Sequence, residues 1–504
     1  MDGRAIAAGI DSWSLMRAAG RAAARMIADR FPGRLAGGVV VYAGGGNNGG
    51  DGYVLAAELA ALGVAVHIVA VDEPATDDAK RARDGLPATV RVEPAVPGTA
   101  THTGQSPPGV VVDALLGTGA TGAPRGPIAD AVAEIAARQS ADAVVVALDV
   151  PTGVDATTGV AMGASVRADL TVTFGSVKRG LLRNRGAAGT IICVDIGLGD
   201  AGNDRAAPEL LGAARALASV PAIGASANKA TRRRLLIIGG SAGMAGAAVL
   251  AARGALRSSI GMVRLCVEQA SVAAVQAGEP TAMTVAWPAG DEVLAEYLRW
   301  AHCVLLGPGL GLAPASRELA ARVLTSWNGP VVVDADALTA FEGKAERLGE
   351  LLAGRPAVIT PHPVEAERLA GLKAADVDAG RFEAAPRLAQ RVKATVLLKG
   401  VPTVVSDGAR SVVVAAGNPV LATGGSGDVL GGIVATLLAQ TKDAMASASS
   451  AAWVHGRAAD IAAQGGIRGA TLDDVVVALR DAWHALAAPV KPVLIELPAV
   501  ADSR

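Results

Sequence analysis

The sequence predicts an α/β protein with two domains, each built on a mostly parallel sheet, and three observations support this. The chain has 504 residues, which is more than one hydrophobic core of ordinary size serves. Short runs of Val, Ile and Leu recur along it, separated by Ala-rich stretches that suit helices. The runs are continuous rather than alternating, which indicates strands buried on both faces. Helices between such strands favour parallel sheets with crossover connections.

The expected strands fall into two sets. Those of the first half are GVVVYAGG, VAVHIVAVD, GVVVDALLG, DAVVVALDVP, LTVTFG and TIICVDIG. Those of the second half are RRLLIIGG, GMVRLCV, HCVLLGPG, PVVVDADAL, PAVITPHP and ATVLLKG, the last followed by a hairpin through SDG. The pattern pauses over residues 199–229. We therefore expect a boundary near residue 215, with domains over residues 1–215 and 216–504.

The composition narrows the function classes. Lys and Arg number 46 against 47 Asp and Glu, so the chain has no basic surplus for nucleic acid or an anionic membrane. No uninterrupted apolar run approaches the roughly 20 residues of a spanning helix. Cys193, Cys266 and Cys303 form no paired motif and are expected as buried apolar residues in a reducing compartment. We expect a cytoplasmic protein whose partners are small molecules, with neither a nucleic acid nor a membrane partner.

A glycine-rich helix opening lies near the C-terminus, in NPVLATGGSGDVLGGIVATLLA. Backbone N–H groups at such an opening form a cradle for an anion, and the helix dipole adds to it. An aspartate in a phosphate cradle is unfavourable unless it has a chemical task. Asp428 could take a proton from a hydroxyl that then attacks a phosphorus atom. The alternative is a tight turn in which Asp428 caps the helix.

Other strand ends of the second half carry unusual residues. Lys399 follows the run VLL and could reach a nucleotide phosphate as a point charge. GPGLG presents bare backbone, and Asp334 ends the run VVV. His362 lies between two prolines at the start of a helix, where it could bind a ligand or cap the helix.

The first half has its own glycine-rich opening, AGGGNNGGDGYVLAAELAALG. It matches a dinucleotide fingerprint only weakly, because amides and Asp51 lie inside the turn. Amide and carboxylate oxygens are ligands for hard cations. Asp113 and Asp149 end neighbouring strands, with Thr152 and Lys178 nearby in sequence. Converging carboxylates repel unless a cation or a lysine neutralises them. The alternative for each aspartate is a helix cap.

The order and spacing of these motifs resemble two enzyme families. GPGLG, TPHPxEAxRL, LLKG and NPxLATGGSGDVLxG, over most of residues 230–490, resemble the ADP- or ATP-dependent NAD(P)H-hydrate dehydratases, which have a ribokinase-like fold. GNNGGDG, VDALLGTG, LDxPTG and TFGxxKxGL, over roughly residues 4–200, resemble the NAD(P)H-hydrate epimerases, which have a Rossmann-like α/β/α fold. The whole chain resembles the bifunctional NAD(P)H-hydrate repair enzymes.

The resemblance implies an activity. The substrate is a damaged reduced nicotinamide cofactor that carries water on C6. An epimerase domain interconverts its R and S forms. A dehydratase domain phosphorylates the C6 hydroxyl of the S form from ADP and eliminates phosphate, giving NAD(P)H, AMP and phosphate. The implied cofactors are Mg2+ and K+, and self-association of the chain is expected.

The resemblance also implies site residues. In the second domain Asp428 is the implied base, and Asp334 falls in the implied magnesium-phosphate region. The implied contacts of the hydrated dinucleotide in that domain are Ala247, Gly309, His362 and Asp428. The implied contacts of the nucleotide are Lys399, Gly400, Val401, Pro402, Thr403 and Gly427.

In the first domain, Asp149 and Lys178 are our candidates for the acid–base groups beside C6. The implied contacts of the hydrated dinucleotide are Asn47, Asn48, Gly49, Gly50, Asp51, Gly117, Thr118, Gly119, Ala120, Thr121, Gly122, Ala123 and Asp149. The implied potassium ligands are Asn48, Asp113 and Thr152.

Two alternatives stay open at this point. The second domain could be a small-molecule kinase for a vitamin precursor, with a stable phosphorylated product. The first domain could be a catalytically silent binding module, as related folds are in some RNA-associated proteins.

Overall fold

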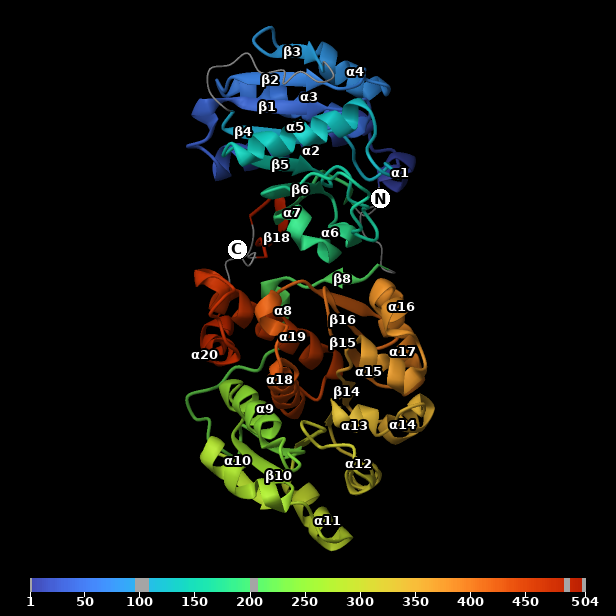
Figure 1. Ribbon diagram of the computed structural model, residues 1–504, viewed down its shortest axis with the longest axis vertical. Coiled ribbons are helices and arrows are strands. Elements are labelled where there is room, and N and C mark those ends of the chain that lie inside the picture. Colours follow the sequence, from blue (N-terminus) through green and yellow to red (C-terminus); the bar gives the residue numbers. More distant parts are fainter. Residues whose placement is uncertain (1, 96–107, 200–206, 485–489, 501–504) are drawn as a thin grey trace. The chain divides into compact units, whose positions relative to one another are not determined.

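The computed structural model describes residues 2–95, 108–199, 207–484 and 490–500. These residues form two compact units (Figure 1). Residues 2–199 and 490–500 make the first unit, and residues 207–484 make the second. Each unit has a mainly parallel sheet covered by helices, so the predicted α/β fold class is confirmed.

The first unit has an eight-stranded sheet in the order β18-β7-β6-β5-β4-β1-β2-β3. Its strands are β1 (Val39–Ala43), β2 (Val66–Ala70), β3 (Arg91–Pro94), β4 (Val110–Ala114), β5 (Val144–Leu148), β6 (Leu170–Phe174), β7 (Thr190–Val194) and β18 (Val493–Leu497). Strands β1 to β7 pair in parallel, whereas β18 lies antiparallel to β7.

Helices cover both faces of this sheet. They are α1 (Asp2–Ala7), α2 (Ser12–Arg30), α3 (Asn47–Ala61), α4 (Asp77–Asp84), α5 (Pro127–Ser140), α6 (Arg179–Arg183) and α7 (Arg185–Ala188). Along β1, Val39 and Val41 join a core cluster with α2 and α3, while Val40 and Tyr42 join another with α5. Successive strand residues face opposite sides, so this division produces an α/β/α arrangement.

The second unit has a ten-stranded sheet in the order β11-β10-β9-β12-β13-β14-β15-β16-β17-β8. Its strands are β8 (Glu209–Leu210), β9 (Arg234–Ile238), β10 (Met262–Val267), β11 (Met283–Ala286), β12 (Cys303–Leu306), β13 (Val331–Val333), β14 (Ala357–Ile359), β15 (Thr395–Leu398), β16 (Thr403–Ser406) and β17 (Ser411–Val414). The expected hairpin through SDG is the antiparallel pair β16–β17, and β15 also pairs antiparallel with β16.

The helices of the second unit also pack on its sheet. They are α8 (Ala213–Ala218), α9 (Ala245–Arg257), α10 (Val272–Gly278), α11 (Asp291–Trp300), α12 (Pro314–Ser326), α13 (Asp336–Thr339), α14 (Ala345–Leu352), α15 (Pro363–Ala370), α16 (Ala374–Ala379), α17 (Arg381–Val392), α18 (Ser426–Thr441), α19 (Ala444–Ala462) and α20 (Leu472–Ala482). Fully buried Leu235, Ile237 and Leu305 cluster with α9, α18 and α19 on one face. These helices support the strand ends that carry the polar residues.

All of the predicted strands are present, and the strands that the pattern missed lie at the sheet edges. These are β3 and β18 in the first sheet and β8 and β11 in the second. Their side chains are mostly exposed or half-buried, because an edge strand has less of the sheet and its helices around it. They therefore lack the continuous apolar run that marks a central strand.

Because of the edge strands, the division between the two units also differs from the expected boundary. The expected boundary near residue 215 falls inside α8. Strand β8, which precedes it, pairs in parallel with β17 of the second unit. Strand β18 near the C-terminus pairs with β7 and returns to the first unit. Nonlocal pairing of this kind satisfies backbone groups at a sheet edge and leaves no local mark in the sequence.

Two further expectations can be compared with the structure. The three cysteines are buried and form no disulfide. No helix in the described part of the chain is both long enough and apolar enough to cross a membrane.

The packing of β18 gives a testable prediction. Leu497 is 7% exposed and Leu494, on the same strand, is 43% exposed. We expect Leu497→Ala to lower the opening free energy of amides in β6 and β7 by about 2 kcal/mol, because a buried side chain is lost at an edge. Hydrogen exchange followed by mass spectrometry would measure it. Leu494→Ala should stay within about 0.5 kcal/mol. Equal effects of both variants, or an effect on β9 and β12, would contradict this assignment.

Candidate active sites

The predicted residues of the first unit gather at the carboxyl ends of adjacent parallel strands. Strands β1, β4, β5 and β6 are neighbours, so the segments that follow them share one edge of the sheet. A Cβ on Gly44 would overlap the carbonyl oxygen of Leu115, and one on Gly49 would overlap that of Gly44. Glycine at both positions lets the turn after β1 pack directly on the segment after β4 and on the start of α3.

Asp113, Thr152 and Asn48 form a buried polar cluster at this edge. Asp113 accepts hydrogen bonds from the Thr152 amide (2.8 Å), the Thr152 hydroxyl (2.7 Å) and the Leu115 amide (3.2 Å). Burial raises the pKa of Asp113 to about 6 despite these bonds. Leu116 donates its amide to Thr152 Oγ1 (3.1 Å), and its carbonyl accepts from Asn48 Nδ2 (3.1 Å). The structure thus brings the three predicted potassium ligands together.

One side-chain oxygen of this cluster lacks a hydrogen-bond donor among the described residues. Asn48 is 7% exposed, and its Oδ1 is buried without a hydrogen-bond partner in the described part of the chain. A buried acceptor without a partner costs free energy, so such groups usually meet a donor, a water or an ion. The nearby oxygens of Asp113, Thr152 and Leu116 are the hard ligands that an alkali cation takes.

Asp149 and Lys178 form an ion pair at the neighbouring strand ends. Lys178 Nζ contacts Asp149 Oδ1 and donates to Thr173 Oγ1 (3.0 Å) and to the carbonyl of Phe174 (2.9 Å). Their side chains are only 17% and 14% exposed. Asp149 has a φ of +64°, a strained conformation for a residue other than glycine. A carboxylate and an ammonium group fixed side by side can act as base and acid on one bound molecule.

The remaining predicted contacts of the first unit are less enclosed. Asn47 is exposed at the start of α3, Gly49 and Gly50 are buried and Asp51 is half-buried. A Cβ on Gly117 would lie 3.4 Å from Asn48 Cβ, so this glycine borders the polar cluster. The other members of the loop are exposed or half-exposed and make no contact with the cluster that the structure records. They are Thr118, Gly119, Ala120, Thr121, Gly122 and Ala123.

In the second unit, Lys399 joins two carboxylates from neighbouring segments. Its Nζ lies 3.2 Å from Asp334 Oδ1 and 3.5 Å from Glu365 Oε2. Asp334 is 1% exposed at the end of β13, and Glu365 is 7% exposed in the first turn of α15. Burial alone would lower the pKa of Lys399, but the charges of Asp334 and Glu365 outweigh it and raise that pKa. Lys399 is therefore a stable cation at the edge of the sheet.

Asp428 faces this charged group from the first turn of α18. Gly425 precedes the helix with a φ of +89° and is its N-cap, so the predicted alternative of Asp428 as the cap is wrong. A Cβ on Gly427 would lie 3.4 Å from Lys399 Nζ, so the lysine reaches the helix opening. Burial, and then the charge of Asp334, raise the pKa of Asp428 to about 7. This value suits a general base at neutral pH.

His362 caps α15, so the capping alternative is confirmed. Its Nδ1 accepts from the amides of Val364 (3.1 Å) and Glu365 (3.3 Å), and its own amide donates to Glu365 Oε2 (2.8 Å). Burial lowers the pKa of His362, which favours the neutral ring. Because Nδ1 accepts, the proton of the neutral ring lies on Nε2. Capping and ligand binding are compatible, since the side chain is 45% exposed.

Gly309 and Ala247, which the sequence places far apart, are in contact. Gly309 has a φ of +56°, and a Cβ there would lie 2.9 Å from Ala247 Cβ and 2.7 Å from the Met244 carbonyl. The next glycine of the loop, Gly311, donates its amide to Asp336 Oδ2 (2.8 Å). The segments after β9, β12 and β13 therefore meet at one place.

The predicted nucleotide segment forms the tight turn between β15 and β16. Its start is fixed by Lys399, whose amide donates to the Pro361 carbonyl (2.9 Å). Thr403 Oγ1 closes the turn by donating to the Gly400 carbonyl (3.2 Å). Pro402 is buried beneath the turn, whereas the apolar side chain of Val401 is 63% exposed.

Sequence reasoning missed several polar residues at this edge. Glu365 lies within the TPHPVEAERL motif, which was the available signal. Ser241 Oγ and Thr360 Oγ1, at the ends of β9 and β14, are buried without hydrogen-bond partners in the described residues. His455 Nε2 in α19 is in the same condition, and burial, followed by the charge of Lys399, lowers the pKa of His455 to about 4. Thr360 opens the same TPHPVEAERL motif, whereas nothing in the local sequence marks Ser241 or His455.

No group of three or more His, Cys, Asp or Glu in the described ranges could hold a metal ion. A divalent cation at Asp334 would therefore need oxygens from a bound phosphate, which is how Mg2+ is usually held in phosphoryl-transfer sites.

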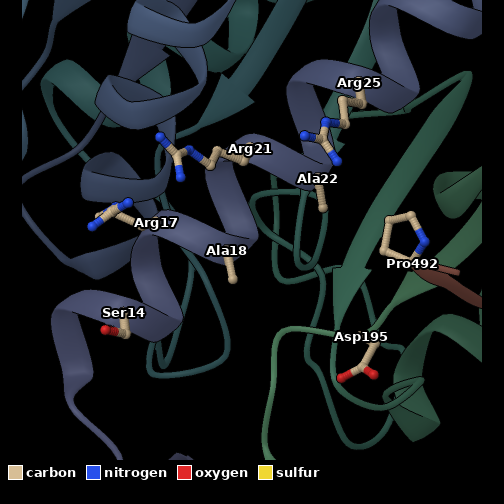
Figure 2. Close-up of a pocket in the computed structure, with 8 residues that line it drawn as sticks. All are labelled: Ser14, Arg17, Ala18, Arg21, Ala22, Arg25, Asp195 and Pro492. Carbon is tan, nitrogen blue, oxygen red and sulfur yellow. The ribbon is translucent and has the colours of Figure 1, made fainter.

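A separate hollow lies in the first unit, and Figure 2 shows its lining. Its volume is about 370 Å3. It is lined by Ser14, Arg17, Ala18, Arg21, Ala22, Arg25, Asp195 and Pro492. None of the predicted site residues lines it. Arg21 pairs with Glu58 (2.6 Å) and Asp195 with Lys491 (3.6 Å), which is typical of solvated surface charges.

Two sheet edges with half-buried acidic and basic groups define a two-domain enzyme, and comparisons with known proteins identify its family. The profile of the NAD(P)H-hydrate dehydratase family matches residues 235–480. The profile described as YjeF-related protein N-terminus matches residues 12–180. The two matches fall within the second and first units respectively.

Curated relatives match most of the chain. The bifunctional NAD(P)H-hydrate repair enzyme of Salinibacter ruber is 38% identical over 90% of this chain and 88% of its own. The enzyme of the same description from Escherichia coli is 34% identical over 94% of this chain and 90% of its own. A solved structure of ADP/ATP-dependent NAD(P)H-hydrate dehydratase from Bacillus subtilis is also similar. The match covers 55% of this chain and 98% of the Bacillus chain, with 25% identity and a TM-score of 0.48. The chain belongs to the family of bifunctional NAD(P)H-hydrate repair enzymes.

The charges around Asp428 give a second prediction. Asp334→Asn should lower the pKa of Asp428, because a negative charge that disfavours its ionised form is removed. Lys399→Met should raise that pKa, because the opposing positive charge is lost. Titration of 13C-carboxyl-labelled aspartate by NMR, with the signal assigned by Asp428→Asn, would measure both. Exposed Asp481→Asn is the control and should change nothing. Shifts of the same sign in both site variants would contradict this electrostatic account.

Proposed function

We propose that this chain repairs hydrated NADH and NADPH in two steps. The first unit interconverts the R and S hydrates at C6. The second unit dehydrates the S hydrate at the expense of ADP, giving NAD(P)H, AMP and phosphate. The observation that carries the proposal is Asp428, whose pKa is about 7 where the helix opening meets Lys399. Family membership supplies the substrate class.

In the second unit, Asp428 takes the proton of the C6 hydroxyl. The oxygen then attacks the β-phosphorus of ADP, and the bond to AMP breaks. The amides of the turn before α18 and the ammonium of Lys399 stabilise the charge of the transferring group. The phosphate ester then loses phosphate from C6 and a proton from C5, which restores the C5=C6 double bond. Near pH 7, Asp428 is poised to accept a proton without remaining permanently ionised.

The proposed positions of ADP and the hydrated dinucleotide follow from where these residues lie at the sheet edge of the second unit. Lys399 and Gly427 contact the nucleotide phosphates, and the turn from Gly400 to Thr403 contacts the nucleotide. Exposed Val401 gives that turn an apolar surface on which a base can pack. The hydrated dinucleotide lies across Gly309 and Ala247.

Polar contacts to the hydrated dinucleotide complete this arrangement. His362 faces it through the Nε2 proton, since Nδ1 is used in the helix cap. The buried hydroxyls of Ser241 and Thr360 are further proposed contacts, because a bound ligand would supply the hydrogen-bond partners that they lack among the described residues.

Asp334 would hold Mg2+ together with nucleotide phosphate oxygens. A Cβ on Gly431 would lie 3.3 Å from Asp334 Oδ2, so this oxygen faces α18 rather than Lys399. The ion would neutralise phosphate charge during transfer. Residues Lys399 and Asp428 then remain available for the nucleotide and the substrate hydroxyl.

In the first unit, Lys178 and Asp149 are the proposed acid and base. Lys178 gives a proton to the departing C6 hydroxyl, which leaves as water with the help of the ring nitrogen. Water then returns to either face of C6 and loses a proton to Asp149. The glycine turn at the start of α3 holds the dinucleotide phosphates through its amides. Residues 47–51 and 117–123 are the proposed walls of this site.

Asn48, Asp113 and Thr152 are the proposed potassium ligands, and the carbonyl of Leu116 is a fourth candidate. The unpartnered Asn48 Oδ1 and the buried charge of Asp113 fit a monovalent cation. The ion would neutralise Asp113 and tie the segments after β4 and β5 to α3.

The potassium site gives a third prediction. Potassium should raise the unfolding midpoint of the first unit relative to tetramethylammonium at equal ionic strength, because it binds the folded cluster. The effect should fade below about pH 6, where Asp113 becomes protonated, since its pKa is raised to about 6. Asn48→Leu should abolish it. Thermal unfolding at pH 5 and pH 8 would test this, and a potassium effect that persists in Asn48→Leu would remove the site from these residues.

The direct test of the proposed function uses mixed hydrated NADH with ADP, magnesium and potassium. We expect full recovery of dihydronicotinamide absorbance, faster than spontaneous epimerisation, with release of inorganic phosphate. Recovery of only about half would mean a silent first unit. A stable phosphorylated product would favour the vitamin-kinase alternative. Recovery with ATP but not ADP would change the phosphoryl donor only.

Two substitutions should separate the activities, which is the fourth prediction. Asp428→Asn should lower the dehydration rate by about 10²–10⁴-fold and leave epimerisation intact, because only the proposed base of the second unit is lost. Lys178→Met should do the reverse. In the wild type, dehydration should rise with pH through about 7, as Asp428 loses its proton. Asp481→Asn is the control for charge loss. A dehydration rate preserved in Asp428→Asn would remove that residue from the role of base.

We further propose that the chain acts in the cytoplasm as a self-associating protein without nucleic acid or membrane partners. The near-neutral net charge of −1 supports the absence of a polyanionic partner. Light scattering of the purified chain would test the self-association.

A further inference from the structure

We infer that Arg381 is a positioning residue that sets the shape of the nucleotide-binding turn, residues 400–403, and thereby the affinity for ADP. This inference rests on the proposed function of the second unit. Arg381 lies at the start of α17, away from the sheet-edge motifs that mark the site in the sequence.

The guanidinium of Arg381 supports the turn from below. Its Nη1 donates to the carbonyl oxygen of Pro402 (2.7 Å), and its Nη2 pairs with Asp378 Oδ1. A Cβ on Gly400 would overlap both η nitrogens and would lie 2.8 Å from Cζ. The backbone of Gly400, with a φ of +143°, therefore rests directly on the guanidinium plane. One side chain contacts both ends of the tight part of the turn.

The position of this arginine is costly for the protein. Arg381 is 1% exposed, and a buried guanidinium loses its hydration. It is also the first residue of α17, where the helix dipole disfavours a cation. Its partner Asp378 is 51% exposed, so only the arginine of this ion pair is buried. Apolar residues often replace buried ion pairs without loss of stability. These costs indicate that the contacts with the turn, rather than stability alone, account for an arginine here.

The planar fork of arginine suits this place for a geometric reason. It donates in two directions while its flat face packs on a glycine backbone, which a lysine ammonium cannot do. The turn that it supports carries exposed Val401 on its outer surface and begins one residue after Lys399. A shift of the turn would therefore move the proposed nucleotide contacts and leave Asp428 and the dinucleotide contacts in place.

The test compares the steady-state kinetics of Arg381→Met and Arg381→Lys with the wild type, in the full chain with magnesium and potassium. We expect Arg381→Met to raise KM for ADP about tenfold, with kcat and KM for the hydrated dinucleotide changed less than about twofold. Arg381→Lys should recover part of the ADP affinity, because one donor to Pro402 is restored. Asp378→Ala, which keeps the guanidinium, should raise KM for ADP less than Arg381→Met.

Arg391→Met is the matched control on the same helix. Arg391 also binds a backbone carbonyl, that of Ala370 (2.8 Å), and an acidic partner, Glu346 (2.8 Å), but it does not contact the turn. Its loss should leave KM for ADP unchanged. An unchanged KM for ADP in Arg381→Met would overturn the inference. It would also be overturned if Arg381→Met and Arg391→Met raised KM for ADP and KM for the hydrated dinucleotide to the same extent. A wild type without ADP-dependent dehydration would instead overturn the proposed function.

Discussion

The electrostatics at the sheet edge of the second unit depend on one half-buried cation. Lys399 lies between Asp334 and Glu365 and faces the opening of α18, where Asp428 is placed. Without its charge, several carboxylates would share a poorly hydrated edge, and the pKa of Asp428 would rise further. The charge of Lys399 opposes burial and the charge of Asp334, which together raise the pKa of Asp428 to about 7. The fold supplies this arrangement because adjacent parallel strands deliver Asp334, Thr360 and Lys399 to the same edge.

The two units solve the same electrostatic problem in different ways. In the first unit, Lys178 pairs directly with Asp149. Among the described residues, the hydrogen bonds recorded for Asp113 come only from the neutral donors Thr152 and Leu115. The buried Asn48 oxygen beside it fits a site completed by a small cation. In the second, one lysine serves two carboxylates, and a nucleotide-bound ion would complete the set. The proposed acid–base pair and the proposed cation site are thus separate clusters in the first unit. In the second unit the proposed base, the lysine and the proposed cation ligand lie in one cluster.

The fold was largely predictable from the sequence, and the misses have a common cause. Central strands are buried on both faces, so β1, β4 and β12 appear as unbroken apolar runs. The strands β3, β8, β11 and β18 lie at sheet edges, where exposure removes that signal. The predicted boundary near residue 215 differs from the division in the structure for the same reason, since β8 and β18 join their sheets by pairing with residues distant in the chain. Local pattern carries no information on such partners.

By itself, the sequence determined the α/β class, the strand ends that carry chemistry and the identity of Asp428, Lys178 and Asp149 as candidates. Glycine turns and strand-end charges are local features, because they follow directly from the residues that form them. Only the tertiary structure decided which groups meet. The contact of Gly309 with Ala247, the entry of Glu365 into the Lys399 pair and the support of the turn by Arg381 each join distant segments. The tertiary structure also determines the pKa of Asp428, because burial and the charges of residues distant in the chain set it.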